Sequence, residues 1–330
     1  MKRKVYKVYF IACALFILTV IQSFAQTLDY SNYDASYEII GNDSAMIKVT
    51  VEGVSFNFVK VEGGKMNLGQ LGVCELNTFW LMETEVTNEI ASLFYEDIYT
   101  ENVYNVRGAR VDLKYAFSKA YTEQEKLLCP FIIYSDFSWY PKSNLYAKEV
   151  YTYLVYVIPN ALNSLLPSIS FSLPSTKQWT YAARGGNKSK HYLYSGSNNQ
   201  DEVAWYVDNS VYVDPYGAIY LLPHLVKQKK ANELGLYDMS GNVCEFTDDD
   251  VIMGAEMMTE FIEYSFTAGN AWFDRSKWYK DSMGKVFCGG GYNSYNCYPA
   301  MSQRAEYIEG VRSGSKTVTP TGLRIALIPR

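Results

Sequence analysis

The stretch "ANELGLYDMSGNVCEF", residues 231–246, sets two glycines, two asparagines and an aspartate among short apolar runs. Glycine, asparagine and aspartate favour tight turns, so the stretch predicts short strands joined by turns. The rest of the C-terminal half has the same character, and no tandem repeat, coiled coil or low-complexity linker divides the chain. We therefore predict one loop-rich α+β domain.

Residues 37–61 alternate apolar and polar side chains, which predicts strands, and Gly63 and Gly64 end this run with a turn. The segments "MNLG" and "TFWLMETEV" predict further short strands. A helix is predicted over "TNEIASLFYEDIY", with Thr87 or Asn88 capping its first turn.

Residues 100–145 show no clean periodicity, and we expect a long excursion with one short helix near "SKAYTEQEKLL". The segment "LYAKEVYTYLVYVIPNALNSL" has helical spacing interrupted near Pro159. In "ISFSLPSTKQWTYAARGG" a strand precedes a helix whose Ser175 and Gln178 have the spacing of a capping box.

Residues 1–25 predict a secretory signal peptide, with a basic head, an apolar core and small residues at Ser23 and Ala25. An alternative makes Cys13 a lipidated residue, but the apolar stretch ahead of it is very short, so lipoprotein anchoring is the less favoured reading. We expect export to the periplasm, the cell envelope or the extracellular space. No later stretch approaches the roughly 20 apolar residues that cross a bilayer, so we expect a chain that does not span the membrane.

Charge argues against nucleic acid as a partner. Removal of the signal takes away four positive charges and no negative ones, so the formal charge goes from -5 to -9. The only basic cluster that remains is "KQKK" at 227–230, whereas a phosphate-binding surface needs many clustered lysines and arginines. A hydrophobic fraction of 48% is that of a globular chain with a substantial core.

From "ANELGLYDMSGNVCEF" outward, the sequence resembles the formylglycine-generating enzyme family, also called the sulfatase-modifying factor family. "FVKVEGGKMNLG", "FWLMETEVTNEIASLF", "SLPSTKQWTYAARGG", "AWYVDNS", "CGGGY" and "TGLRIAL" follow the family's motif order. The resemblance covers about residues 54–330, with insertions at roughly 100–145 and 249–283, behind an N-terminal extension, residues 26–53, that holds a strand. It implies an α+β fold with little regular secondary structure, distantly related to C-type lectins.

Family members that generate formylglycine use copper held by two cysteines five positions apart, just after the glycine-rich strand. The corresponding positions here are Ser294 and Pro299, and no two cysteines of the chain are five apart. Because Cu(I) is selected by thiolates, copper is not expected. Cys288 and Cys297 remain an alternative as displaced ligands. A sulfoxide synthase is also disfavoured, because its iron needs three imidazoles and the chain has only two histidines.

A disulfide is the preferred use of Cys288 and Cys297, since a glycine turn between them lets the chain fold back to the usual Cα spacing of roughly 5.5 Å. Cys74 and Cys129 form a possible second pair. Cys244 occupies the family's buried tryptophan position and is expected to be the leftover thiol.

The resemblance also implies a structural calcium ion. Its ligands would be the side chains of Asp238 and Glu245 and the carbonyls of Gly241 and Val243, hard oxygens that suit Ca²⁺. In the alternative interpretation, Asn242 and Glu245 only make hydrogen bonds in the turn. The arginines at the family's positions, Arg184, Arg304 and Arg324, are expected to be structural.

These observations predict a non-catalytic domain that binds a peptide, protein or glycan. Tyr292, Tyr295, Asn296 and Tyr298 are the candidate contacts, because tyrosine rings and an amide suit such ligands. Two alternatives stay open. One is a formylglycine-generating oxidase that acts on sulfatase cysteines through a rearranged thiol site, and the other is a scaffold subunit of a cell-envelope assembly.

Overall fold

The computed structural model describes residues 30–68, 72–95, 103–106, 109–112, 118–132, 144–250, 285–294 and 321–329. The chain divides into residues 1–33 and residues 34–330. The first unit is described only at its end, where η1 (Tyr30–Asn32) forms one 3-10 turn, so the predicted signal peptide lies outside the described residues. Everything below concerns the second unit.

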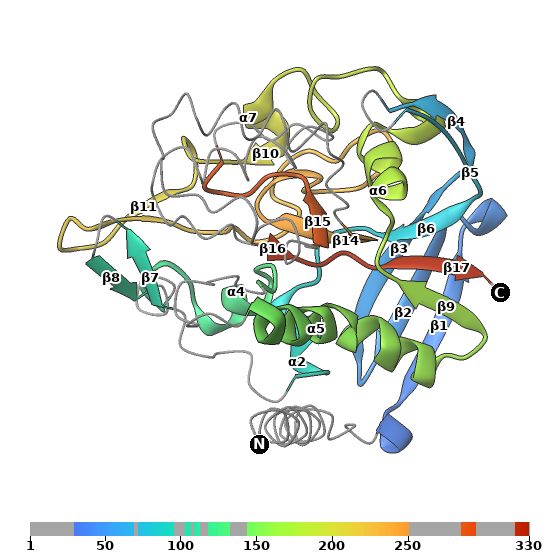
Figure 1. Cartoon of the computed structure of the whole chain (residues 1–330), viewed down its shortest axis with the longest axis horizontal. Coiled ribbons are helices and arrows are strands. Elements are labelled where there is room, and N and C mark those ends of the chain that lie inside the picture. Colours follow the sequence, from blue (N-terminus) through green and yellow to red (C-terminus); the bar gives the residue numbers. More distant parts are fainter. Residues whose placement is uncertain are drawn as a thin grey trace, which may run out of the picture. The chain divides into compact units, whose positions relative to one another are not determined.

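A six-stranded antiparallel sheet dominates this unit, in the order β1-β2-β3-β6-β17-β9 (Figure 1). Its strands are β1 (Ala35–Ile40), β2 (Met46–Val51), β3 (Val54–Val61), β6 (Phe79–Met82), β9 (Ile169–Ser172) and β17 (Ala326–Pro329). The first three confirm the strands predicted over residues 37–61. β17 lies in the sheet between β6 and β9, pairing Ala326 with Leu81 and Leu327 with Phe171, so it joins β9 to the other strands.

Among the described residues the helices are short except for one. They include η2 (Asn42–Ser44), α2 (Asn88–Ser92), α4 (Glu123–Leu127), α5 (Asn144–Leu165), α6 (Thr176–Ala183), η5 (Gly186–Lys188) and α7 (Gln200–Val203). Thr87 caps α2, and Ser175 and Gln178 form the predicted capping box of α6. In the parts of the chain described, no helix is long and apolar enough to cross a membrane.

Helix α5 does not break at Pro159 as predicted, but continues through it. A proline removes one backbone hydrogen bond, and here tertiary contacts outweigh that loss. Ile158 and Leu162 on either side are fully buried. Asn163 donates to Phe171 O at 2.7 Å and accepts from Phe171 N at 2.9 Å, which fastens the helix to β9.

Smaller sheets make up the remainder. β14 (Cys244–Asp250) lies between β15 (Lys285–Cys288) and β16 (Thr321–Gly322), and β10 (Ala204–Trp205) pairs in parallel with β13 (Ser240–Gly241). Three hairpins are formed by β4 (Gly64–Asn67) with β5 (Val73–Leu76), β7 (Val103–Val106) with β8 (Ala109–Asp112), and β11 (Val211–Val213) with β12 (Ile219–Leu221). The β7–β8 hairpin lies in the segment predicted to be irregular.

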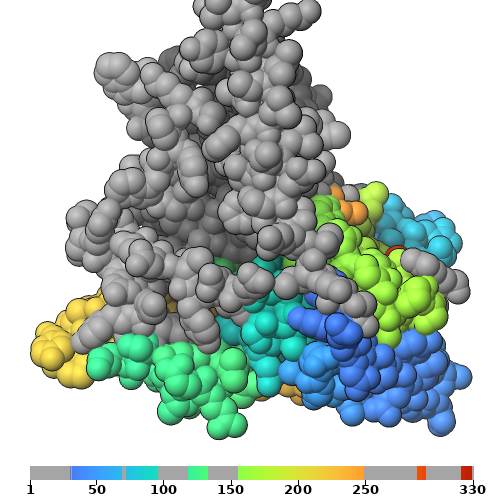
Figure 2. Space-filling model, turned by 90° about the horizontal axis from the view of Figure 1, so that it is seen from below, coloured from blue at the N-terminus to red at the C-terminus, as the bar shows by residue number. Residues whose placement is uncertain are grey.

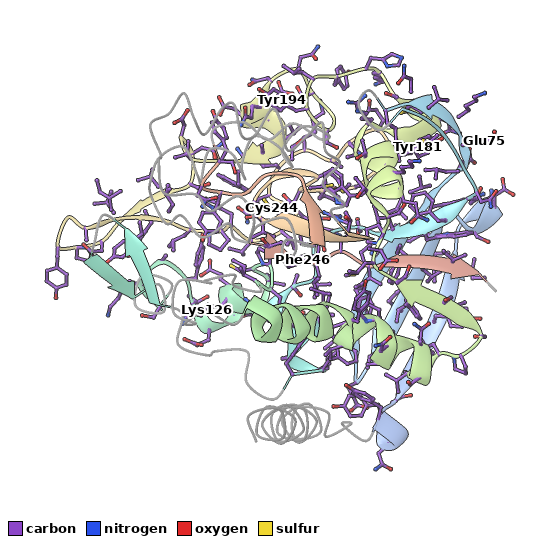
Figure 3. The ribbon with its side chains drawn as sticks, in the orientation of Figure 1. Glu75, Lys126, Tyr181, Tyr194, Cys244 and Phe246 are labelled. Carbon is purple, nitrogen blue, oxygen red and sulfur yellow. The ribbon has the colours of Figure 1, made fainter. Side chains whose placement is uncertain are left out.

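The core lies between the large sheet and α6, with β14 and β15 on the other side of this helix (Figure 1). Trp179 and Tyr181 of α6 pack in one cluster with Leu81, Cys74 and Cys288. Figure 3 labels Tyr181 together with Cys244 and Phe246, two further buried side chains, on β14.

The predicted pairing of Cys74 with Cys129 is wrong, because both are buried free thiols. Cys74 lies on β5 inside the cluster around Trp179. Cys129 follows α4 and accepts a hydrogen bond at its carbonyl from Asn88 N of α2, so the two cysteines belong to separate parts of the structure.

One buried ion pair connects these layers. Arg324 and Glu245 have no exposed side-chain surface, and Arg324 Nη2 lies 2.8 Å from Glu245 Oε1. Arg324 also donates to the carbonyls of Met82 and Tyr237, while Trp179 Nε1 donates to Glu245 Oε2 at 2.6 Å. Burial alone would lower the pKa of Arg324, but the Glu245 charge and hydrogen bonds outweigh it and the pKa is raised. The expected structural role of Arg324 agrees with these contacts.

We predict that Arg324→Met lowers the free energy of unfolding by about 3–5 kcal/mol, because Glu245 is left buried without a cation. Urea denaturation measures the change. Adding Glu245→Gln to this variant should recover part of the loss, since the amide removes the charge and keeps an acceptor for Trp179.

Lys48→Met is the control for Arg324→Met. Lys48 pairs with Glu38 at 3.0 Å, with side chains 37% and 60% exposed, and such surface pairs contribute less than about 1 kcal/mol. Equal losses in Arg324→Met and Lys48→Met would contradict the role given to the buried pair.

Candidate ligand-binding site

The turn between β13 and β14 is held in a conformation that few residues tolerate. Asp238 and Asn242 have φ values of 57° and 61°, and Gly241 has 82°, all in the left-handed region. A Cβ on Gly241 would lie 2.3 Å from Trp205 O, so only glycine fits against β10. The sequence "SGN" therefore brings the turn into direct contact with Trp205.

Asn242 uses this position to fix two aromatic residues. Its own backbone N–H donates to Trp205 O at 2.8 Å. Its side chain accepts from His224 N at 2.9 Å and donates to His224 O at 3.1 Å. Because Asn242 is fully buried, these bonds are shielded from water and hold Trp205 and His224 in register.

The rings of Trp205 and His224 are stacked, with centroids 3.7 Å apart and planes 15° apart. Lys229 Nζ lies over the Trp205 ring, 4.0 Å from its centroid. Trp205 Nε1 and His224 Nε2, in these two rings, are buried and have no hydrogen-bond partner among the described residues, and the same holds for Ser210 Oγ and Thr180 Oγ1. Leaving a buried polar group unpartnered costs about 1–3 kcal/mol, so two in one pair of stacked rings suggest a binding site.

His224 is neutral near pH 7, because burial, followed by the charge of Lys229, lowers its pKa from 6.5 to about 4. The Tyr121 hydroxyl donates to Pro223 O at 2.9 Å, and its oxygen lies 3.5 Å from His224 Nδ1. This arrangement assigns the proton to Nδ1 and leaves Nε2 as an acceptor. The site therefore offers one donor, Trp205 Nε1–H, and one acceptor, His224 Nε2.

Ser294, at the position where the resemblance expects the family's first cysteine, contacts the segment after Trp205 and makes hydrogen bonds with two backbone N–H groups. Its hydroxyl accepts from Gly291 N at 2.9 Å, and its carbonyl accepts from Val207 N at 3.0 Å. The side chain is 5% exposed. Pro299, at the second cysteine position, lies outside the described residues.

The predicted bridge from Cys288 to Cys297 is not found, since none of the described cysteines is disulfide-bonded. Cys288 is 1% exposed and packs in the cluster around Trp179, whereas Cys297 lies outside the described residues. Cys244 is fully buried, in agreement with the expected core thiol.

Of the predicted ligand contacts, only Tyr292 is described, and its burial does not suit that role. It is 4% exposed, its backbone N–H donates to Asn242 O, and burial raises the pKa of its hydroxyl. Tyr292 is thus a buried residue that supports the turn through its backbone hydrogen bond to Asn242. Tyr295, Asn296 and Tyr298 lie outside the described residues and stay a prediction.

The residues do not fit the calcium site that the resemblance implies. Both oxygens of Glu245 accept from Arg324, a cation, and Asp238 Oδ2 accepts from Lys227 N at 2.9 Å. The described residues contain no group of three or more His, Cys, Asp or Glu side chains placed to hold a metal ion. The alternative, in which Asn242 and Glu245 only make hydrogen bonds in the turn, is not found either, because Asn242 bonds to His224 and Glu85 and Glu245 pairs with Arg324, all outside the turn.

A third carboxylate, Glu85, lies in the same buried region. It accepts from Val243 N at 3.1 Å and from Asn242 Nδ2 at 2.9 Å. Burial, and then the charges of Asp238 and Glu245, raise the pKa of Glu85, while burial raises the pKa of Asp238 to about 6. The raised pKa values reflect the excess of carboxylates over the single guanidinium in this buried region.

Sequence reasoning missed Trp205, His224 and Lys229 as site residues. Trp205 lies in the motif "AWYVDNS", and His224 is one of only two histidines, so the sequence offered a reason to consider both as site residues. Their stacking joins positions far apart in the chain, and only the structure shows it.

We predict that the His224 ring adds stability above about pH 6.5 that is lost as the pH falls toward about 4. The folded pKa is depressed, so acid favours the unfolded chain, which binds the proton more readily. His224→Phe keeps a stacked ring without the titration. Thermal midpoints from pH 7 to pH 4 should fall more steeply for the wild type, and parallel curves would contradict the depressed pKa.

Three solved structures resemble this one at low sequence identity. CarF has a TM-score of 0.46 with 17% identity, covering 82% of this chain and 97% of CarF. Treponema denticola variable protein 1 has 0.41 and 20%, covering 85% and 98%, and PvdO from Pseudomonas aeruginosa has 0.41 and 15%, covering 82% and 94%.

A curated relative, chaperone protein LppX from Paenibacillus barcinonensis, is 48% identical over 85 residues, which are 23% of this chain and 30% of that protein. The chain thus matches less than a third of the relative's length. The sulfatase-modifying factor enzyme 1-like domain family matches residues 48–326, most of the chain, which confirms the predicted fold class of mixed helix and strand with little regular secondary structure. The chain belongs to the family of sulfatase-modifying factor enzyme 1-like domains.

Proposed function

We propose that this protein is an exported binding member of its family, which recognises a polypeptide or glycan and lacks copper-thiolate oxidation. The observation that carries the proposal is Ser294. Its hydroxyl stands at the family's first cysteine position and is engaged with Gly291 N. A neutral hydroxyl is a poor ligand for Cu(I), which is selected by thiolates.

The unpartnered atoms of the Trp205 and His224 stack support a ligand with paired polar groups. A donor at Trp205 Nε1 and an acceptor at His224 Nε2 complement the C=O and N–H of a peptide amide. Sugar hydroxyls, which donate and accept, offer the same complement. The name of the curated relative, a chaperone, favours the polypeptide.

Copper-dependent oxidation is tested with the mature protein, Cu(I), oxygen and a sulfatase-type cysteine peptide, followed by mass spectrometry. We expect no aldehyde from the wild type, with a known active enzyme run alongside. Conversion by the wild type that is lost in Cys288→Ser or Cys297→Ser would instead establish the rearranged thiol site.

Binding is tested by titrating uncharged peptides and oligosaccharides against the wild type and Trp205→Phe, which keeps a stacked ring and removes the N–H. Losing one hydrogen bond of about 0.5–1.5 kcal/mol should weaken binding by about 2- to 10-fold. Trp80→Phe is the matched control, because Trp80 Nε1 donates to Ser44 O elsewhere, so its loss should leave affinity unchanged. Unchanged affinity in Trp205→Phe would remove Trp205 from the site.

Export by residues 1–25 is part of the proposal, and an intact mass that includes these residues in protein recovered outside the cytoplasm would contradict it. The scaffold alternative, a subunit of a cell-envelope assembly, predicts a stable partner that co-purifies in place of a dissociable ligand.

A further inference from the structure

The β11–β12 hairpin lies in the chain between Trp205 and His224, two residues of the candidate site, and it carries an exposed apolar face. It begins after Ser210 and returns to Leu222, two residues before His224. On one face, Tyr212 and Tyr220 pack with Leu222 and Tyr121. On the other, Val211, Val213 and Ile219 are 51%, 55% and 68% exposed. Figure 1 shows the hairpin extending away from β10, and the yellow segment that includes it lies at one edge of Figure 2.

The hydrogen-bond phase of the hairpin decides which backbone groups face outward. Leu222 N donates to Ser210 O at 3.1 Å, and Asp214 N donates to Ala218 O at 2.9 Å. Paired residues alternate between bonded and non-bonded sites in an antiparallel ladder, so the N–H and C=O of Val211 and Val213 point away from β12. Neither residue has a backbone partner among the described residues.

This edge lacks most of the features that usually prevent strand addition, although β11 is only three residues long. Natural edge strands are blunted by shortness, exposed charges, prolines or covering segments. Asp214 is the only charged residue in the hairpin, is 6% exposed, and accepts from Tyr216 N and Ala218 N. The single proline, Pro215, lies in the turn rather than on either strand. The outer edge of β11 thus combines free backbone groups with uncharged β-branched side chains.

We propose that the outer edge of β11 binds an extended, uncharged polypeptide segment by β-strand addition. This inference rests on the proposed function and names its ligand as a polypeptide. A strand added at Val211 and Val213 satisfies their backbone groups and covers their side chains, and it ends near Ser210, whose hydroxyl is unpartnered. The net negative charge of the chain disfavours a second copy as the occupant.

Val213→Pro tests the inference, because it removes an outward N–H that the hairpin ladder does not use, and proline is tolerated on edge strands. Val213→Thr is the matched control, since it keeps the N–H and the branched shape. The probe is an uncharged peptide of about seven alternating threonines and valines, acetylated and amidated, with two terminal serines for solubility. Titration calorimetry gives its affinity, and thermal midpoints show that each variant is folded.

We expect Val213→Pro to weaken binding by about 2- to 10-fold, for the loss of one hydrogen bond, and Val213→Thr by less than about 2-fold. A second test changes the peptide and leaves the protein intact. Two peptides are compared, one N-methylated at the odd-numbered residues and the other at the even-numbered residues, and only one of these two should lose binding. That test holds even where Val213→Pro fails to fold.

Equal affinities for wild type and Val213→Pro, or equal effects of both methylation phases, would overturn strand addition while leaving peptide binding in place. A wild type that binds no peptide but binds a glycan would overturn the inference alone, whereas one that binds neither would overturn the proposed function. Dimerisation of the wild type that Val213→Pro abolishes would assign the edge to a second copy and reject the peptide.

Discussion

The buried pair of Arg324 and Glu245 is the interaction on which the rest of the structure depends. Arg324 precedes β17, the strand that completes the large sheet, and Glu245 lies on β14 of the three-stranded sheet. Bonds from the same guanidinium reach Met82 O and Tyr237 O, and Trp179 of α6 donates to Glu245. Two sheets, a helix and a loop thus share one charge pair, which is costly to bury and more costly to break.

That pair also determines how the neighbouring turn is used. Glu245 directs its oxygens to Arg324 and Trp179, so this carboxylate is engaged by a guanidinium and an indole N–H. Asn242 then holds the backbones of Trp205 and His224 while bonding to Glu85. The loop-rich part of the fold is stabilised in this way by buried polar groups that are nearly all satisfied, which makes the few unsatisfied ones informative.

Three of the four unpartnered buried atoms among the described residues occur in the same continuous segment as the bare strand edge. Trp205 and Ser210 precede the hairpin and His224 follows it, so the hairpin connects the two stacked residues along the chain. A surface with backbone hydrogen-bonding groups, β-branched side chains and little charge suits a polypeptide better than a nucleic acid. Ser294 contacts this segment, since its carbonyl accepts from Val207 N.

The sequence by itself determined the family, the strands over residues 37–61, a helix capped by Thr87 or Asn88, and the Ser175–Gln178 capping box. These features depend on residues at most a few positions apart, or on motif order. Only the tertiary structure decided that α5 continues through Pro159, that Cys74 and Cys129 stay apart, and that Glu245 takes Arg324 as its partner 79 positions away. Burial is the physical reason, because a buried carboxylate, ring nitrogen or thiol must find its partners inside the protein. Those partners come from distant parts of the chain, so a local sequence pattern does not identify them.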